Sequence, residues 1–434
     1  MKKLSDGLLK DPRILFNEQT IDPEYPTNIT TEDRIKGALM GTLIGDALGQ
    51  GCLWYYDYND LWKQYGTWVD NYVDPQKDGA ETQMAKIAEY KYAAGVRAGF
   101  SSQTGQLIQV LLETIVADID KKGPHAQGEF VGSHYTETIN KFFEEELLPR
   151  ASFEVADKDE PNTFFGNGIQ CYSGRYTNRE VRENFDIWYN NGQKNGKWWE
   201  DPITSVTSTS DGAQMGVVLA ALYRDPVELF NKAYEMLRMW YSDPAFISQA
   251  LDYLLVLQAI INGVALKDMK NYLADIVYDM GEIGKRMSSF DDLSSGAKMI
   301  TMVAKPQLFN FDDRFAPMIF GSNCHIFHLL PCAYYYSYKY NHEFERPVLI
   351  AVNSGGNNMA RAALTGALSG AMNGIQAIPQ RFIDGLATEE RLLHENYSSH
   401  AAYLMALAEK VAKGSNGIIN PYQAKDGEDC GCLI

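Results

Sequence analysis

The sequence predicts an all-α protein of roughly a dozen helices. Three observations support this fold class. Apolar residues recur at helical spacing through most of the chain, and no run of β-branched residues alternates with the period of a strand. Hydrophobic residues make up 45% and charged residues 22% of the 434 residues. These proportions exclude a disordered chain and a collagen-like fibre.

The first helix is predicted to begin at Thr30-Thr31-Glu32-Asp33, where hydroxyl side chains precede acidic ones. A later helix begins after Ser242-Asp243-Pro244, which places a proline in the first turn. Long irregular stretches are expected at 155–205 and 305–322. Helices are predicted over 34–49, 81–98, 104–119, 213–224, 228–240, 245–262, 266–280, 325–340 and 361–374.

Small residues dominate two of these helices. Gly37, Gly41 and Gly45 recur every four residues, so they share one helix face. Each helical glycine costs about 1 kcal/mol relative to alanine. A face built from three of them indicates that another backbone packs closely against it. We expect the partner to be the second small-residue helix, at 362–374, near the centre of the fold.

The domain organisation predicted is a single all-α domain over 31–413. An irregular lead-in occupies 1–30, and a polar tail occupies 414–434. The tail ends in a Cys-Gly-Cys sequence at Cys430 and Cys432, which is either a disordered end, a soft-metal ligand or a redox pair.

The net charge of −17, from 39 basic and 56 acidic residues, disfavours nucleic acid and anionic membranes as partners. The six cysteines show no zinc-type spacing and read as reduced thiols. The chain shows no secretory leader and, by inspection, no 18-residue apolar span. We therefore expect a cytoplasmic protein.

Three blocks of sequence resemble the ADP-ribosylglycohydrolase family, which also contains the J1 crystallins. The first runs from Asp33 to Gly49 and ends Gly45-Asp46-Ala47-Leu48-Gly49. The second is Glu81-Thr82-Gln83-Met84. The third is Gly355-Gly356-Asn357-Asn358-Met359-Ala360-Arg361, followed by the small-residue helix and Ile378-Pro379.

This resemblance implies an orthogonal multi-helix bundle with a central cleft. In the family the cleft holds two magnesium ions, bound by acidic and hydroxyl side chains of the second and third blocks. The enzymes cleave the bond between the ribose anomeric carbon and a protein side chain or another ADP-ribose. Paired divalent ions can orient ribose hydroxyls and activate water.

The implied metal site is depleted in both blocks. In the second block, Ala80 occupies the position of one acid of the family pair, while Glu81 and Thr82 retain oxygen ligands. In the third block the acids fall on Asn357 and Met359. An asparagine oxygen adds no negative charge, and methionine is a poor magnesium ligand.

At most one magnesium ion is therefore expected, and no metal is the alternative. Its ligands would be Glu81, Thr82 and Asn357. Ala360 replaces the hydroxyl after the second acid of the third block. If the alignment of that block shifts by one residue, Asn358 replaces Asn357 as the ligand.

The candidate catalytic carboxylates are Glu81, Asp46 and Asp57. Asp57 is the first acid after the Gly-Asp-Ala segment, where the family places one, and the alternative is a surface loop acid. Asp46 lies within the glycine-rich helix, and its alternative role is a carboxylate bonded to neighbouring backbone.

The candidate substrate-binding residues flank the glycine turn of the third block or lie in polar loops. Arg361 stands in an otherwise apolar segment, so it needs a partner, which is Glu81, Asp46 or a bound phosphate. The set is Ser354, Gly355, Gly356, Asn358, Arg361, Asn323 and Trp199. The expected partner is a small molecule or an ADP-ribosylated or glycosylated substrate.

Other polar and aromatic residues have two interpretations each. His325 and His328 lie on one helix face and are either core histidines or transition-metal ligands. Asp211 either caps a helix or lines the cleft. Trp198 and Tyr189 are either filler or, like Trp199, a stacking surface for a base or sugar.

Three functions follow from these observations. The first is a glycoside-bond hydrolase of the ADP-ribosylglycohydrolase type with a reduced magnesium site. The second is a metal-independent hydrolase of another glycoside. The third is a non-catalytic structural or ligand-binding protein, like the crystallin branch.

Overall fold

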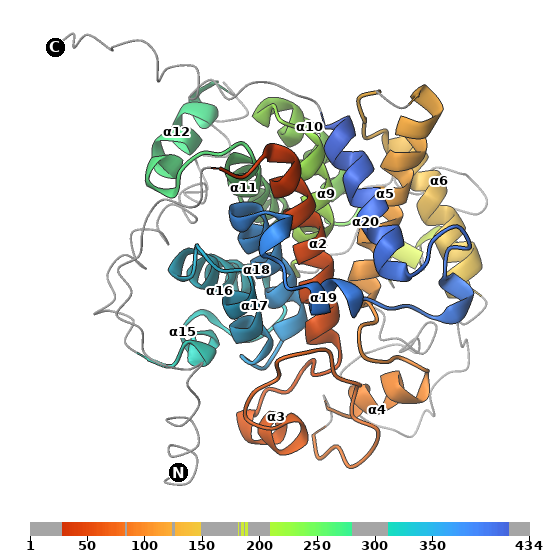
Figure 1. The fold of residues 1–434 in the computed structure, drawn as a ribbon, viewed down its shortest axis with the longest axis vertical. Helices are drawn as coiled ribbons and strands as arrows, with labels where there is room; N and C mark the ends of the chain where they lie inside the picture. The colour runs from red at the N-terminus through yellow and green to blue at the C-terminus, as the bar shows by residue number, and fades with distance from the viewer. Residues whose placement is uncertain are drawn as a thin grey trace, which may run out of the picture.

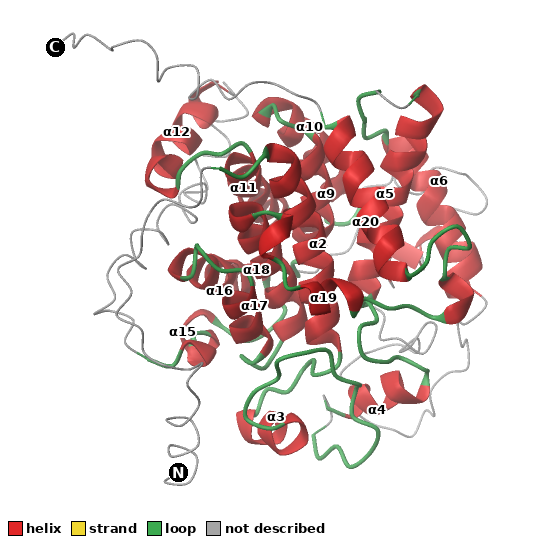
Figure 2. Cartoon of the chain, in the orientation of Figure 1, coloured by secondary structure: helices red, strands yellow, loops and turns green. Residues whose placement is uncertain are grey.

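Helix α2 (Thr31–Gln50) runs through the centre of the protein (Figure 1). The computed structural model describes residues 28–82, 85–123, 126–148, 181, 184–185, 187–189, 209–279 and 311–415. Within these ranges the chain forms helices and loops and no extended strand (Figure 2). Two isolated bridges, Phe100 to Ala387 and Thr209 to His325, are the β-type pairings there. The predicted all-α class is confirmed.

Helix α18 (Asn358–Asn373) packs antiparallel against α2 at backbone distance. A Cβ atom added to Gly41 would lie 2.1 Å from the carbonyl oxygen of Gly366, and one added to Gly45 would lie 2.1 Å from that of Ala362. A Cβ on Gly37 would meet Gly370 in the same way. The predicted contact between the two small-residue helices is therefore confirmed.

Other helices surround this pair in two sets. The inner set contacts α2 or α18 and comprises α5 (Gln103–Lys122), α9 (Asp211–Leu222), α11 (Pro244–Ile261), α16 (Ile326–Lys339), α17 (Glu345–Val352), α19 (Gln380–Asp384) and α20 (His400–Gly414). The other set comprises α3 (Tyr58–Tyr65), α4 (Lys86–Ala93), α6 (Gly132–Phe142), α10 (Pro226–Arg238), α12 (Met269–Asp279) and α15 (Pro317–Phe320).

Helix α11 corrects one expectation. Its 18 residues have a mean hydropathy of 1.5, so by length and composition it could span a membrane. However, 83% of that stretch is buried inside the protein, as in the core helix of a soluble protein. The span is not evident as an unbroken apolar run in the sequence, because Gln249, Asp252 and Gln258 interrupt it.

Several helices differ from the sequence predictions. The helix expected over 81–98 is confined to α4, because the chain turns at Gly95, whose φ is +90°. Helices α3, α6, α17 and α20 were not among the predicted helices. Part of the stretch expected to be irregular, 305–322, contains the four-residue helix α15.

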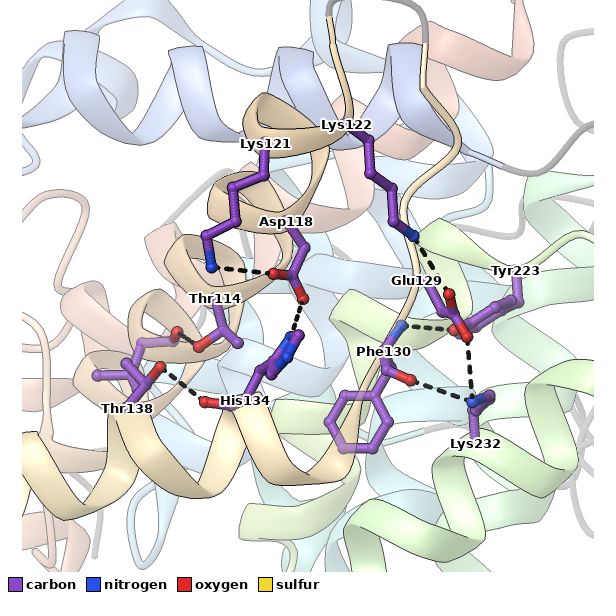
Figure 3. Close-up of polar contacts among 11 residues, drawn as sticks. Thr114, Asp118, Lys121, Lys122, Glu129, Phe130, His134, Thr138, Tyr223 and Lys232 are labelled. Atoms are coloured by element: carbon purple, nitrogen blue, oxygen red, sulfur yellow. Dashed lines mark hydrogen bonds and ion pairs between the residues drawn. The ribbon is translucent and has the colours of Figure 1, made fainter.

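Polar side chains join α5 to α6 and α10 on one side of the bundle (Figure 3). Nδ1 of His134 lies 2.7 Å from Oδ2 of Asp118, which connects α6 to α5. The Phe130 carbonyl accepts a hydrogen bond from the ammonium group of Lys232 in α10. The Phe130 N–H donates to the Tyr223 hydroxyl. The first contact holds the C-terminal half of α5 against α6, and the others hold the loop before α6 against α10 and the end of α9.

Substitution of Gly41 tests the close helix contact. Gly41→Ala should lower the free energy of unfolding by about 3 kcal/mol, because the new methyl group meets backbone that cannot move aside. Urea denaturation followed by circular dichroism measures the change. Gly132→Ala is the control, because Gly132 also lies in a helix and its new methyl group meets only the flexible carboxyl end of Glu235, so little loss is expected. Equal losses in both variants would contradict the close contact.

Candidate functional site

The C-terminal part of α2 meets the first turns of α5, α9 and α18. We call this set of four helix ends the helix-end ring. It is connected by hydrogen bonds and by van der Waals contact from each helix to the next. For example, a Cβ on Gly49 near the end of α2 would lie 2.3 Å from Cα of Met359 in the first turn of α18.

Asp46 connects α2 to α5. Its carboxylate is fully buried and accepts hydrogen bonds from the backbone N–H of Ser102 (2.7 Å) and from the Ser102 hydroxyl (2.5 Å). Ser102 is the N-cap of α5. Burial raises the pKa of Asp46 to about 6, against the lowering effect of the Ser102 bonds. Asp46 is thus both bonded to neighbouring backbone and poised to titrate near neutral pH.

Asp211 connects α5 to α9. It is the first residue of α9, and its two carboxyl oxygens accept hydrogen bonds from the hydroxyls of Thr104 and Thr209. Burial raises its pKa, and its negative charge also raises the pKa of Asp46. The charge of Asp211 therefore acts on Asp46 across the first turn of α5.

The loop before α16 connects α9 to α18. The backbone of Thr209 pairs with that of His325, and the carbonyl of Ser322 accepts the N–H of Asn357 (2.9 Å). Asn323, a predicted substrate-binding residue, lies in this loop. Its Oδ1 accepts the N–H of His325 and lies 2.7 Å from Nδ1 of His328. The loop therefore places polar side chains beside the ring.

The glycine turn before α18 is fixed on its carbonyl side. Both Gly355 and Gly356 have φ +59°, a conformation that favours glycine. The Gly355 carbonyl accepts Nη1 of Arg361 (2.9 Å), and the Gly356 carbonyl accepts the N–H of Trp54 (3.0 Å). The Ser354 carbonyl accepts the Tyr58 hydroxyl (2.9 Å). These three hydrogen bonds hold the turn in one conformation directly before the first turn of α18.

Arg361 is fully buried and forms no ion pair with any residue that the structure describes. Its Nε and Nη2 have no hydrogen-bond partner there. The predicted pairing with Glu81 or Asp46 is therefore not seen. Instead Arg361 positions the glycine turn.

The hydroxyl of Ser354 and the side-chain amide of Asn358 also form hydrogen bonds within the protein. Ser354 Oγ donates to the Ile350 carbonyl (2.6 Å) and lies 2.8 Å from the Tyr336 hydroxyl. Asn358 Nδ2 donates to the carbonyls of Val352 (2.7 Å) and Cys52 (3.1 Å). Both residues therefore support the turn from behind.

Glu81 and Asp57 have other partners. Glu81 is exposed and pairs with Lys63 at the rim of a small hollow beside Tyr55. Asp57 is exposed and caps α3 through the N–H of Asn59 (2.8 Å). Asp46 accepts its hydrogen bonds from Ser102 at the start of α5, and neither Glu81 nor Asp57 takes part in this contact.

The described residues do not fit a magnesium site. Thr82 Oγ1 accepts the N–H of Ala85 (3.2 Å), and Asn357 Oδ1 caps α18 through the N–H of Ala360 (3.4 Å). No group of three or more His, Cys, Asp or Glu residues gathers in the described part of the chain. Met359 lies in a small apolar cluster with Leu53, Trp54 and Ile87, with Cys324 packed against it. Carbon and sulfur thus stand at a position where the resemblance implies a carboxylate.

The remaining candidates have structural roles or lie outside the description. Nδ1 of His325 accepts the N–H of Phe327, and the rings of His325 and His328 lie 5.2 Å apart. Burial and the neighbouring His328 lower the pKa of His325. The ring of Tyr189 stacks on Phe185. Trp198, Trp199, Cys430 and Cys432 lie outside the described residues.

Sequence reasoning missed Ser102, Thr104 and Lys91. Ser102 directly precedes a clear amphipathic helix and Thr104 lies in its first turn. The capping position of Ser102 was therefore readable, but the contacts of these two residues with two acids were not. Lys91 lies on the same helix face as Ile87 and Ala88, which are both buried. A lysine at that spacing was the available signal for a buried charge.

Comparison with known proteins agrees with this architecture. The family model described as ADP-ribosylglycohydrolase matches residues 27–417. A solved structure titled "ADP-ribosylglycohydrolase-related protein complex" superposes with a TM-score of 0.54 at 16% identity, covering 89% of this chain and 99% of that one. At this identity the likeness shows the fold alone. No curated protein matches the chain.

The pKa of Asp46 predicts a pH dependence of stability. A carboxyl group with a higher pKa when folded holds its proton more tightly in the folded state, so stability falls as pH rises from about 4 to 6. Asp46→Asn cannot titrate. Relative to this variant, the wild type should therefore lose about 3 kcal/mol of unfolding free energy over that interval. Denaturant titrations at stepped pH measure it, with Asp57→Asn, an exposed site, as the control. A difference that does not vary with pH would contradict the assignment.

Proposed function

The chain belongs to the ADP-ribosylglycohydrolase family, and we propose that it hydrolyses an ADP-ribosyl or related ribosyl bond at the helix-end ring. The family's members are generally hydrolytic enzymes. The observation that carries the proposal is the pair of buried carboxyl groups, Asp46 and Asp211, which accept hydrogen bonds from Ser102 and Thr104 at the start of α5.

Asp211 is the proposed general acid and base. In its protonated form it donates a proton to the leaving group as the bond from the ribose anomeric carbon breaks. Water then attacks that carbon, and its proton passes to the Asp211 carboxylate. Asp46 is a positioning residue, because it is fully buried and holds Ser102, the N-cap of the helix whose Thr104 hydroxyl donates to Asp211.

An anionic substrate suits the same place. The N-terminal ends of α5, α9 and α18 all meet in the ring, and the dipole of each helix places partial positive charge there. The diphosphate of an ADP-ribosyl group is one such anion. This supports a small-molecule or ADP-ribosylated substrate rather than a neutral sugar.

The proposed reaction uses no magnesium. The side chains at the ring include Met359 and an apolar cluster in place of the implied acids, so no step is assigned to a metal ion. A net charge of −17 supports the expectation that neither nucleic acid nor membrane is a partner. The cytoplasm remains the proposed location.

A non-catalytic, crystallin-like role is the second candidate. It is favoured by the same apolar cluster of Leu53, Trp54, Ile87 and Met359, which excludes water from part of the ring. In that case the ring binds a ligand or only stabilises the fold.

Turnover without metal tests the proposal. Peptides ADP-ribosylated on arginine or serine and a panel of ribosides should include a substrate that is cleaved equally with EDTA and with Mg²⁺. Asp211→Asn should lower kcat by about 100-fold or more, because it removes the transferable proton. Product formation is followed by chromatography.

Asp120→Asn is the matched control, because Asp120 is exposed and pairs only with Lys410 among the described residues; its activity should equal that of the wild type. Loss of activity on adding EDTA would exclude the metal-free mechanism. Absence of turnover on every substrate would favour the non-catalytic candidate.

A further inference from the structure

A lysine is buried in the part of the fold where the resemblance implies magnesium. Lys91, on α4, is 3% exposed. Its ammonium group donates to Oε1 of Gln50 (3.1 Å) and lies 5.3 Å from the centre of the Trp54 ring. Burying an ammonium group costs several kcal/mol unless its surroundings compensate the charge.

The surroundings of Lys91 are suited to a cation. Its charge lowers the pKa of Asp46 and that of the buried Cys52 thiol, although burial raises both overall. Gln50 is the last residue of α2, which has no basic residue of its own in its last turn. The ammonium group therefore meets the negative end of the α2 dipole. The Trp54 ring face adds a cation–π contact.

The surroundings of Lys91 lack the acidic metal ligands that the family resemblance implies. Trp54, whose ring lies beside the Lys91 ammonium, belongs to the apolar cluster that contains Met359. Met359 and Asn357 fall where the resemblance implies acids that bind the metal. The substitutions thus remove negative charge from the ring, and Lys91 adds a fixed positive charge there.

We propose that the ammonium group of Lys91 replaces the divalent cation, so that the ring binds the oxyanions of an ADP-ribosyl ligand without metal. This rests on the proposed function for the ligand class, but not on turnover. Lys91 is a positioning residue, because its charge acts through Gln50, Trp54 and the adjacent Asp46 rather than by contact with the reacting atoms.

The first test measures ADP-ribose binding by calorimetry. The wild type should bind with the same Kd in EDTA and in Mg²⁺. Lys91→Met should weaken binding about tenfold or more, whereas Lys91→Arg, which keeps the charge, should retain most of the affinity. Equal affinity in Lys91→Met and the wild type, or binding by the wild type only with Mg²⁺, would overturn the proposal.

The second test uses Mg²⁺ itself as the probe and needs no ligand. The wild type should show no Mg²⁺-dependent rise in Tm. The variant Asn357→Asp/Met359→Asp/Lys91→Met should gain one, because acids replace the lost ligands and the competing cation is gone. The same double acid substitution with Lys91 retained should gain less. If retention of Lys91 makes no difference to the Mg²⁺ response, the proposal is wrong.

These outcomes separate the two proposals. Binding of ADP-ribose that depends on Lys91 but without turnover would refute the hydrolase and support the role of Lys91. Turnover with a rate and KM unaffected by Lys91→Met would support the hydrolase and refute that role. Thermal melts of each variant without Mg²⁺ show that loss of binding does not come from unfolding.

Discussion

The glycine-lined contact between α2 and α18 is the constraint on which the rest of the structure depends. Backbone oxygen of each helix occupies the volume that a Cβ of the other would need, at Gly41 and Gly366 in both directions. This contact brings the last turns of α2 beside the first turn of α18. Asp46 and the glycine turn at Gly355 therefore belong to one rigid unit, and α5 and α9 complete the helix-end ring by bonding to it.

The sequence was sufficient to predict this central unit but only part of the site. Three glycines at four-residue spacing carry their own physical reason, so the α2–α18 contact could be inferred, whereas Asp46 was a candidate only through the family resemblance. The roles of Glu81 and Asp57 could not be decided from the sequence. A carboxylate in an exposed ion pair or in a helix cap is the same residue type as a carboxylate in a catalytic site. Ser102, Thr104 and Lys91 act through contacts with distant helices, which no local pattern reports.

The helix-end ring is rigid because its backbone carbonyls and carboxyl groups are hydrogen-bonded to other parts of the protein. The carbonyls of the glycine turn are occupied by Arg361, Trp54 and Tyr58, so its conformation does not depend on a ligand. Ser102, the N-cap of α5, is in turn tied to Asp46, and Thr104 in the first turn of α5 is tied to Asp211 at the start of α9. The groups left to act on a substrate are the two buried acids and the positive ends of the helix dipoles, which is an arrangement preorganised for a developing charge.

Charge balance explains how this fold can lose its metals without losing the site. The arrangement that the resemblance implies sets two divalent cations against four carboxylates, which is close to neutral. Here Asn357 and Met359 stand in place of two of those carboxylates, and the buried Lys91 ammonium supplies a positive charge that acts on Asp46. Metal ions held without those acids would leave an excess of positive charge, and Lys91 beside a full set of metal ions would add to that excess. Each change is therefore easier to accommodate in a buried site when the other is present.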